Sequence, residues 1–184
     1  MRLSLKISSW AIAIVVMLLS VSFAIYDIFC FQPHRGEITR LIQVATTEES
    51  EPPALIVQLV RASAGENLDW LVTRLIIDNL NISHKPESLV GWHIESFLWL
   101  QLVRIRLTEQ EQLTLYLAQV HTGKDLKGFS STAQVIFNKP LSALSPQEAA
   151  TIAALPHAPS IFAKSSERLA KRREYLLSKL ENGS

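Results

Sequence analysis

Apolar residues recur at helical spacing over most of the chain, and no stretch alternates with the period of two that a half-buried strand needs. The pattern therefore predicts an all-α domain downstream of Pro53. The predicted helices cover residues 55–62, 68–80, 88–107, 108–122, 146–155 and 166–181.

Helix start and stop signals support three of these boundaries. Thr108 and Glu111 have the spacing of a capping box, in which each side chain bonds the other's backbone amide, and Ser145 and Glu148 repeat it around Pro146. Gly123 is suited to end the helix that starts at Thr108, because glycine adopts left-handed geometry without a Cβ penalty.

The predicted helix 88–107 is apolar almost all round, and Ser88 is its candidate cap. A helix without a polar face is normally enclosed by other elements. We therefore expect it to be the central helix of the domain, with Glu95 in its middle.

The segment from Ile7 to Tyr26 contains no charged residue. As a helix, a segment of this length can cross a bilayer. Arg2 and Lys6 precede it and Asp27 follows it, so the positive-inside rule places the domain outside the cytoplasm. A cleaved signal peptide is the alternative, since Ser22 and Ala24 are small residues near its end.

The expected organisation has four parts. After the membrane anchor, one short amphipathic stretch is followed by the acidic, proline-ended "TTEESEPP". The parts are a cytoplasmic N-terminus at 1–6, a transmembrane anchor at 7–31, a juxtamembrane linker at 32–52 and a globular domain at 53–184.

Composition excludes several classes of function. A net charge of +1 lacks the basic excess of a dedicated nucleic-acid binder. Cys30 is the single cysteine, and the five histidines are scattered, so neither an internal disulfide nor a metal site is predicted.

From Tyr116 onward the sequence resembles peptidoglycan glycosyltransferases of family 51, the modules of class A penicillin-binding proteins and the monofunctional transglycosylases. The resemblance runs without a gap from 116 to 160 and continues in "RRxxLLxxL". It rests on Tyr116, Leu117, Gly123, Gly128, Ala133, Gln134, Phe137, Lys139, Leu144, Glu148, Ala149, Ala150, Ala153, Leu155, Pro156, Pro159, Ser160, Arg172 and Arg173.

This resemblance implies a lysozyme-like helical fold, anchored by a single span on the outer face of the bacterial cytoplasmic membrane. It also implies a chemistry, the joining of lipid II disaccharides with release of a polyprenyl pyrophosphate. In such enzymes a glutamate of a Glu-Asp pair is the general base, while cationic residues and a divalent ion such as Mg²⁺ or Mn²⁺ offset the charge of the leaving group.

The catalytic motifs are degenerate in this chain. Ser63 and Ala64 align with the Glu-Asp pair, and neither side chain can act as a base at neutral pH. The next motif, which helps to hold the donor, has no counterpart. In the third motif Glu95 remains but the two cations do not, and in the fourth Glu109, Thr114 and Ala118 replace the polar residues of the family.

Two glutamates are therefore the candidate catalytic residues. Glu95 can act as an acid or base with a raised pKa, or can simply accept hydrogen bonds from helix ends. Glu66 can replace the missing base if the chain is shifted. The candidate substrate-binding residues are Lys124, Gln134 and Lys139, for which solvated surface is the alternative.

The sequence thus predicts a cell-wall pseudoenzyme that binds lipid II, glycan strands, membrane lipids or a cell-wall synthase. Two alternatives remain. One is an active, divergent glycosyltransferase that uses a divalent cation, and the other is a purely structural partner of a membrane protein.

Overall fold

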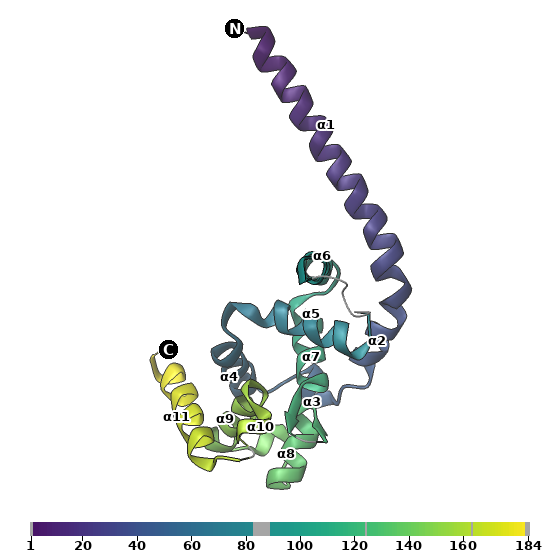
Figure 1. Cartoon of the computed structure of the whole chain (residues 1–184). Coiled ribbons are helices and arrows are strands. Elements are labelled where there is room, and N and C mark those ends of the chain that lie inside the picture. Colours follow the sequence, from purple (N-terminus) through teal and green to yellow (C-terminus); the bar gives the residue numbers. More distant parts are fainter. Residues whose placement is uncertain (1, 83–88, 124, 163, 183–184) are drawn as a thin grey trace. The chain divides into compact units, whose positions relative to one another are not determined.

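The computed structural model describes residues 2–82, 89–123, 125–162 and 164–182 (Figure 1). Its contacts divide the chain into two compact units, Met1–Glu37 and Ile38–Ser184.

The first unit is built on one long helix, α1 (Arg2–Tyr26). A π-helical turn, η1 (Asp27–Phe31), and a 3-10 turn, η2 (Gln32–His34), follow and lead into α2 (Arg35–Gln43). The helical stretch Trp10–Gln43 is long and apolar enough to cross a membrane. The residues expected to form the anchor, 7–31, are therefore helical.

The second unit is almost entirely helical, as the sequence predicted. The predicted cap Ser88 lies outside the described residues. The elements after α2 are α3 (Thr47–Ser50), α4 (Ala54–Ala64), η3 (Gly65–Asn67), α5 (Leu68–Asn79), α6 (Leu89–Arg106), α7 (Glu109–Gln119), β1 (His121–Gly123), β2 (Leu126–Lys127), α8 (Phe129–Phe137), η4 (Leu141–Ala143), α9 (Pro146–Ala154), η5 (Leu155–His157), α10 (Pro159–Phe162) and α11 (Ser166–Asn182).

Both predicted capping boxes form. The Thr108 hydroxyl accepts from the amide of Glu111 at 3.2 Å, and the Glu111 carboxylate accepts from the Thr108 amide at 2.8 Å. Ser145 and Glu148 do the same at the start of α9. These reciprocal bonds satisfy amides that a helix start would otherwise leave without partners.

The central helix is α7, so the expectation for 88–107 was wrong. The side chains of α7 from Gln112 to Leu117 are all buried, and the helix contacts α3, α5 and α8. In contrast, α6 packs chiefly on α5 and buries Trp99, Leu102 and Val103 on that side only. Its other face is apolar but exposed.

The segment between α7 and α8 contains a small antiparallel hairpin, in which β1 pairs with β2. Helix α7 ends at Gln119, before the position that the sequence suggested, and Gly123 lies in β1. Gly128 has φ +84°, and a Cβ there would lie 2.9 Å from the carbonyl oxygen of Ala118. Only glycine therefore allows α8 to start so close to α7.

Residues 38–52, expected to be part of a linker, belong to the second unit. Glu48 accepts from the amides of Leu141 and Ser142 at 2.7 and 3.0 Å. The buried carboxylate of Glu49 accepts from the amide of Ser130 at 2.9 Å, in the first turn of α8. These two acidic residues fix α3 against the C-terminal half of the domain.

Candidate functional site

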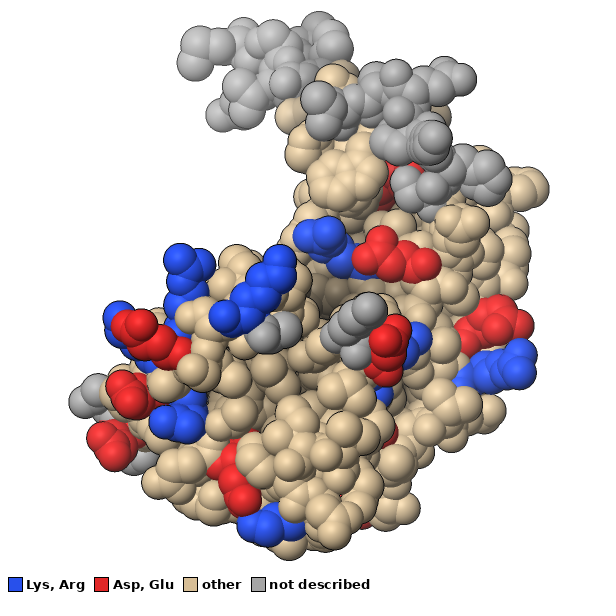
Figure 2. All heavy atoms as spheres, turned by 60° about the horizontal axis from the view of Figure 1, so that its bottom comes forward, with Lys and Arg blue, Asp and Glu red and all other residues tan. Residues whose placement is uncertain are grey.

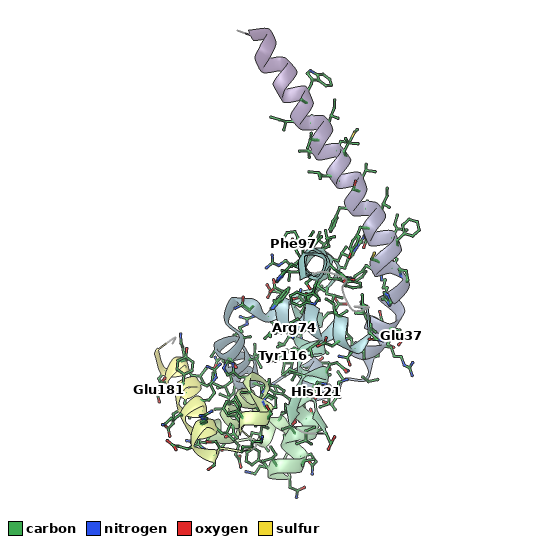
Figure 3. All side chains as sticks on the ribbon, viewed as in Figure 1. Glu37, Arg74, Phe97, Tyr116, His121 and Glu181 are labelled. Carbon is green, nitrogen blue, oxygen red and sulfur yellow. The ribbon has the colours of Figure 1, made fainter. Side chains whose placement is uncertain are left out.

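A cavity of about 450 Å³ lies where α4, α5, α7 and the β1 hairpin meet; we call it the Ser63 cavity. Figure 3 labels three of its residues, Arg74 from α5, Tyr116 from α7 and His121 from β1. The polar residues in its lining are Ser63, Arg74, Asp78, Tyr116, His121 and His157.

Ser63, which the sequence resemblance led us to expect at the position of the family's base, lies in the wall of this cavity near the end of α4. Its hydroxyl donates to the carbonyl oxygen of Ala153 at 3.1 Å. From α11, Nη2 of Arg172 donates to the carbonyl and hydroxyl oxygens of Ser63 at 3.3 and 3.4 Å. This hydrogen bond connects α4 to α9, and the guanidinium of Arg172 lies beside the hydroxyl.

Tyr116 is buried beneath the cavity, with its ring 6.1 Å from that of Phe129. Burial raises the pKa of Tyr116 to about 12, although the charge of Arg172 opposes this shift. Its hydroxyl therefore stays protonated at neutral pH and can act as a hydrogen-bond donor but not as a base.

The described lining of the cavity contains one carboxylate, that of Asp78, which is exposed. Glu95 is half-buried on α6 and does not line the cavity. The side chain of Glu66 lies outside the described residues. Neither Glu95 nor another described glutamate therefore lies in the lining of this cavity beside Ser63.

The two described candidate substrate-binding residues, Gln134 and Lys139, do not line the cavity either. Lys139 is bound to Glu148, with Nζ 2.7 Å from Oε1, and this bond is the main reason that the pKa of Glu148 is lowered. Gln134 donates to the side chain of Asn138 at 2.5 Å. Lys124 lies outside the described residues.

Sequence reasoning missed Arg74, Asp78, His121 and His157 as cavity residues. They come from α5, β1 and η5, and no motif links them. Arg172 belonged to the recognised pattern but had no assigned role. Only the three-dimensional fold brings it to Ser63, 109 positions earlier in the chain.

A second, larger groove of about 1160 Å³ is lined by the α4–α5 and α6–α7 corners. Four of its charged residues form two pairs, Arg104 with Asp69 at 2.5 Å and Arg61 with Glu109 at 3.8 Å, and Glu51 also lies in the lining. Size alone favours this groove, but Ser63 and Tyr116 lie in the smaller cavity, so we take the smaller one as the candidate site.

No group of three or more His, Cys, Asp or Glu residues that could hold a metal ion occurs among the described residues. The basic residues of α11 are interspersed with acidic ones, visible at the left of Figure 2. The exposed face of that helix is therefore a solvated surface of mixed charge.

Comparisons with known proteins identify relatives that match part of this chain. The chain is similar to penicillin-binding protein 1A of Escherichia coli, with 39% identity over 112 residues, 59% of this chain and 13% of that protein. It is also similar to penicillin-binding protein 1A of Neisseria flavescens, with 40% identity over 100 residues, 53% of this chain and 11% of that protein. The matched region thus spans only a small part of these relatives.

A model of the family described as transglycosylase matches residues 77–181. The match begins inside α5, so α4 and Ser63 precede it. It includes α7, the hairpin and α9, which form much of the core and part of the Ser63 cavity. Because the match covers more than half of the chain, this protein belongs to the transglycosylase family.

Proposed function

We propose that this protein is a membrane-anchored, transglycosylase-like pseudoenzyme of cell-wall biogenesis that binds lipid II or a glycan strand without polymerising it. A single transmembrane helix anchors it in the bacterial cytoplasmic membrane, and its helical domain lies on the periplasmic side. Cell-wall synthases are the proposed protein partners.

One observation carries the proposal, the hydrogen bonding of Ser63. Both oxygens of this residue accept from Arg172, and its hydroxyl donates to α9. A general base must accept a proton from the attacking sugar hydroxyl, and a serine hydroxyl flanked by a cation has no tendency to do so.

The cavity keeps features that suit binding. Its volume lies within the range of about 300–1,000 Å³ typical of small-molecule sites. Arg74 is a permanent cation, and the two histidines add donors that can meet phosphate or sugar oxygens. Apolar residues such as Leu71 and Leu75 complete the lining.

Incubation of the purified full chain in nanodiscs with fluorescent lipid II and Mg²⁺ or Mn²⁺ tests the proposal. We expect lipid II to bind and no glycan chains to form. Arg74→Ala should weaken binding about tenfold, since it removes a charge-assisted hydrogen bond. Arg168→Ala on α11 is the matched control, because Arg168 is exposed and does not line the cavity.

The alternative functions give different results in the same experiment. Glycan chains that disappear in Glu66→Gln or Glu95→Gln would establish an active divergent enzyme. A purely structural role would give a third result. Neither lipid II nor isolated glycan strands would then bind, and a membrane protein would be captured.

A further inference from the structure

Arg172 carries a positive charge that no acidic residue balances. Its guanidinium donates to the carbonyl and hydroxyl oxygens of Ser63 at 3.3 and 3.4 Å and lies 5.1 Å from the ring of Tyr175, so these partners are all neutral. Among the described residues, no carboxylate forms an ion pair with Arg172, and its buried Nε has no hydrogen-bond partner. Because a half-buried cation without a counter-ion is costly, its surroundings favour an anion.

The hydroxyl of Tyr116 is a second group without a partner. Tyr116 is only 4% exposed and lines the Ser63 cavity, yet its hydroxyl makes no hydrogen bond to any described residue. Buried polar groups of folded proteins nearly always have a hydrogen-bond partner. Since this hydroxyl keeps its proton at neutral pH, it can donate to an oxygen atom of a ligand in the cavity.

The charges of the described lining indicate which kind of anion fits. Arg74 and Asp78, both exposed on α5, contribute one positive and one negative charge, and the histidines count as neutral at pH 7. Arg172 is hydrogen-bonded to Ser63 in the cavity wall and adds one uncompensated positive charge. A monoanion such as a carboxylate balances this charge, whereas a diphosphate carries more than one negative charge.

We propose that the Ser63 cavity binds a carboxylate of its ligand, with the Tyr116 hydroxyl as donor and the charge of Arg172 nearby. This inference rests on the proposed function, because it takes the cavity as the ligand site. The sequence resemblance aligns Ser63 and Ala64 with a Glu-Asp pair, which implies carboxylates of the chain itself in active relatives. In this protein both of those negative charges are missing, and the ligand supplies one instead.

Peptidoglycan contains a carboxylate in two chemical settings. A glycan strand without peptides carries one on the lactyl group of each N-acetylmuramic acid, and a stem peptide carries one at its C-terminus. Both are planar monoanions with two acceptor oxygens, so they offer the same chemistry to a hydroxyl donor beside a cation. N-acetylglucosamine has the same sugar ring without the lactyl group and is therefore the neutral control.

Thermal unfolding of the full chain in nanodiscs tests the proposal, because a ligand that binds only the folded state raises the melting temperature. The probes are N-acetylmuramic acid, N-acetyl-D-alanyl-D-alanine, N-acetylglucosamine and inorganic pyrophosphate, at equal concentration and constant ionic strength. We expect the melting temperature to rise with at least one carboxylate probe, to rise less with pyrophosphate and to stay unchanged with N-acetylglucosamine.

Two variants of Ser63 separate the effect of charge from that of size. Ser63→Glu places a carboxylate near Arg172 and should abolish the shift that the carboxylate probes cause, whereas Ser63→Gln has nearly the same size as Ser63→Glu without the charge and should keep a measurable shift. Tyr116→Phe should weaken binding of the carboxylate about fivefold, since it removes one hydrogen-bond donor. A cooperative melting transition without probe shows that each variant is folded.

The possible results distinguish this inference from the proposed function. A shift with N-acetylmuramic acid alone, or with the dipeptide alone, supports the proposal and identifies the sugar or the peptide as the source of the carboxylate. An equal shift with N-acetylglucosamine, a larger shift with pyrophosphate, or equal shifts in Ser63→Glu and Ser63→Gln would overturn it.

Binding of lipid II or glycan strands without a shift from either carboxylate probe would also overturn the inference, but would leave the proposed function intact. A shift with a carboxylate probe without binding of lipid II or glycan strands would have the opposite meaning. The carboxylate site would then stand, and the proposed function would be wrong.

Discussion

Nη2 of Arg172 lies 3.4 Å from the hydroxyl oxygen of Ser63, so α11 contacts α4 near its end, at the residue that the sequence resemblance aligns with the family's Glu-Asp pair. The guanidinium also lies 5.1 Å from the ring of Tyr175. Arg172 thus connects the C-terminal helix to the wall of the candidate site, and this contact is testable.

Ser63→Ala should destabilise the domain modestly. The substitution removes the bond to the Ala153 carbonyl and one of two acceptors for Arg172, which costs about 1 kcal/mol in free energy of unfolding. The melting temperature should fall by roughly 3 °C. Ser160→Ala is the matched control at an exposed position and should leave it unchanged.

Arg172→Ala should cost more than Ser63→Ala, since it also removes the packing of the guanidinium over Tyr175. In the double variant the two effects should be less than additive by at least about 0.5 kcal/mol, because the residues share a hydrogen bond. Strict additivity in the denaturation midpoints would show that the contact contributes nothing to stability.

Tyr116 should make stability fall at high pH. Its pKa is raised from 10.0 to about 12, so the folded state keeps a proton that the unfolded chain has already lost. The stability linked to this proton is complete below pH 10.0 and is lost as the pH rises toward 12, by about 1.4 kcal/mol per pH unit.

Tyr116→Phe is the variant that isolates this effect, since phenylalanine keeps the ring and has no proton to lose. Denaturation of both proteins at several pH values gives the comparison, because lysine titration is common to both. The wild type should lose stability more steeply between pH 10 and pH 12. Parallel curves would contradict the assignment of a buried, protonated hydroxyl to Tyr116.

Gly128→Ala should prevent normal packing between α7 and α8. The new Cβ would lie 2.9 Å from the Ala118 carbonyl oxygen and 3.1 Å from Glu49, at a φ of +84° that alanine rarely adopts. We expect a loss of about 2 kcal/mol or more in free energy of unfolding. Gly123→Ala, in the hairpin that precedes Gly128, is the control, since its Cβ would meet Leu126 at an ordinary 3.5 Å, and it should cost much less.

The sequence predicted the elements that depend on local chemistry. Thr108 and Ser145 start helices as expected because a capping box needs only residues three positions apart. The central position of α6 was predicted wrongly, because an apolar periodicity cannot distinguish a face covered by protein from one that is exposed. The hairpin was missed because two or three residues per strand are too few to show a period.

The candidate site was only partly predictable for a related reason. Ser63 was found by its place in a motif, whereas Arg172 reaches it through the packing of α11 on α4 and α9. No local sequence pattern predicts such a contact. Glu48 and Glu49 were likewise interpreted as linker residues, because the amides that they bind belong to distant segments.

Glu48 should make the domain sensitive to acid. The Ser142 hydroxyl and the amides of Ser142 and Leu141 donate to this carboxylate and lower its pKa below 4.5. A lowered pKa contributes stability that is present above pH 4.5 and is lost as the pH falls through the pKa of the folded state.

Glu48→Gln should therefore be less stable than the wild type at neutral pH and should lose less stability on acidification. Glu51→Gln, at an exposed neighbouring position, is the matched control and should follow the wild-type curve. Since Glu48 joins α3 to η4, a Glu48→Gln curve parallel to that of the wild type would mean that α3 does not depend on this charge for its position.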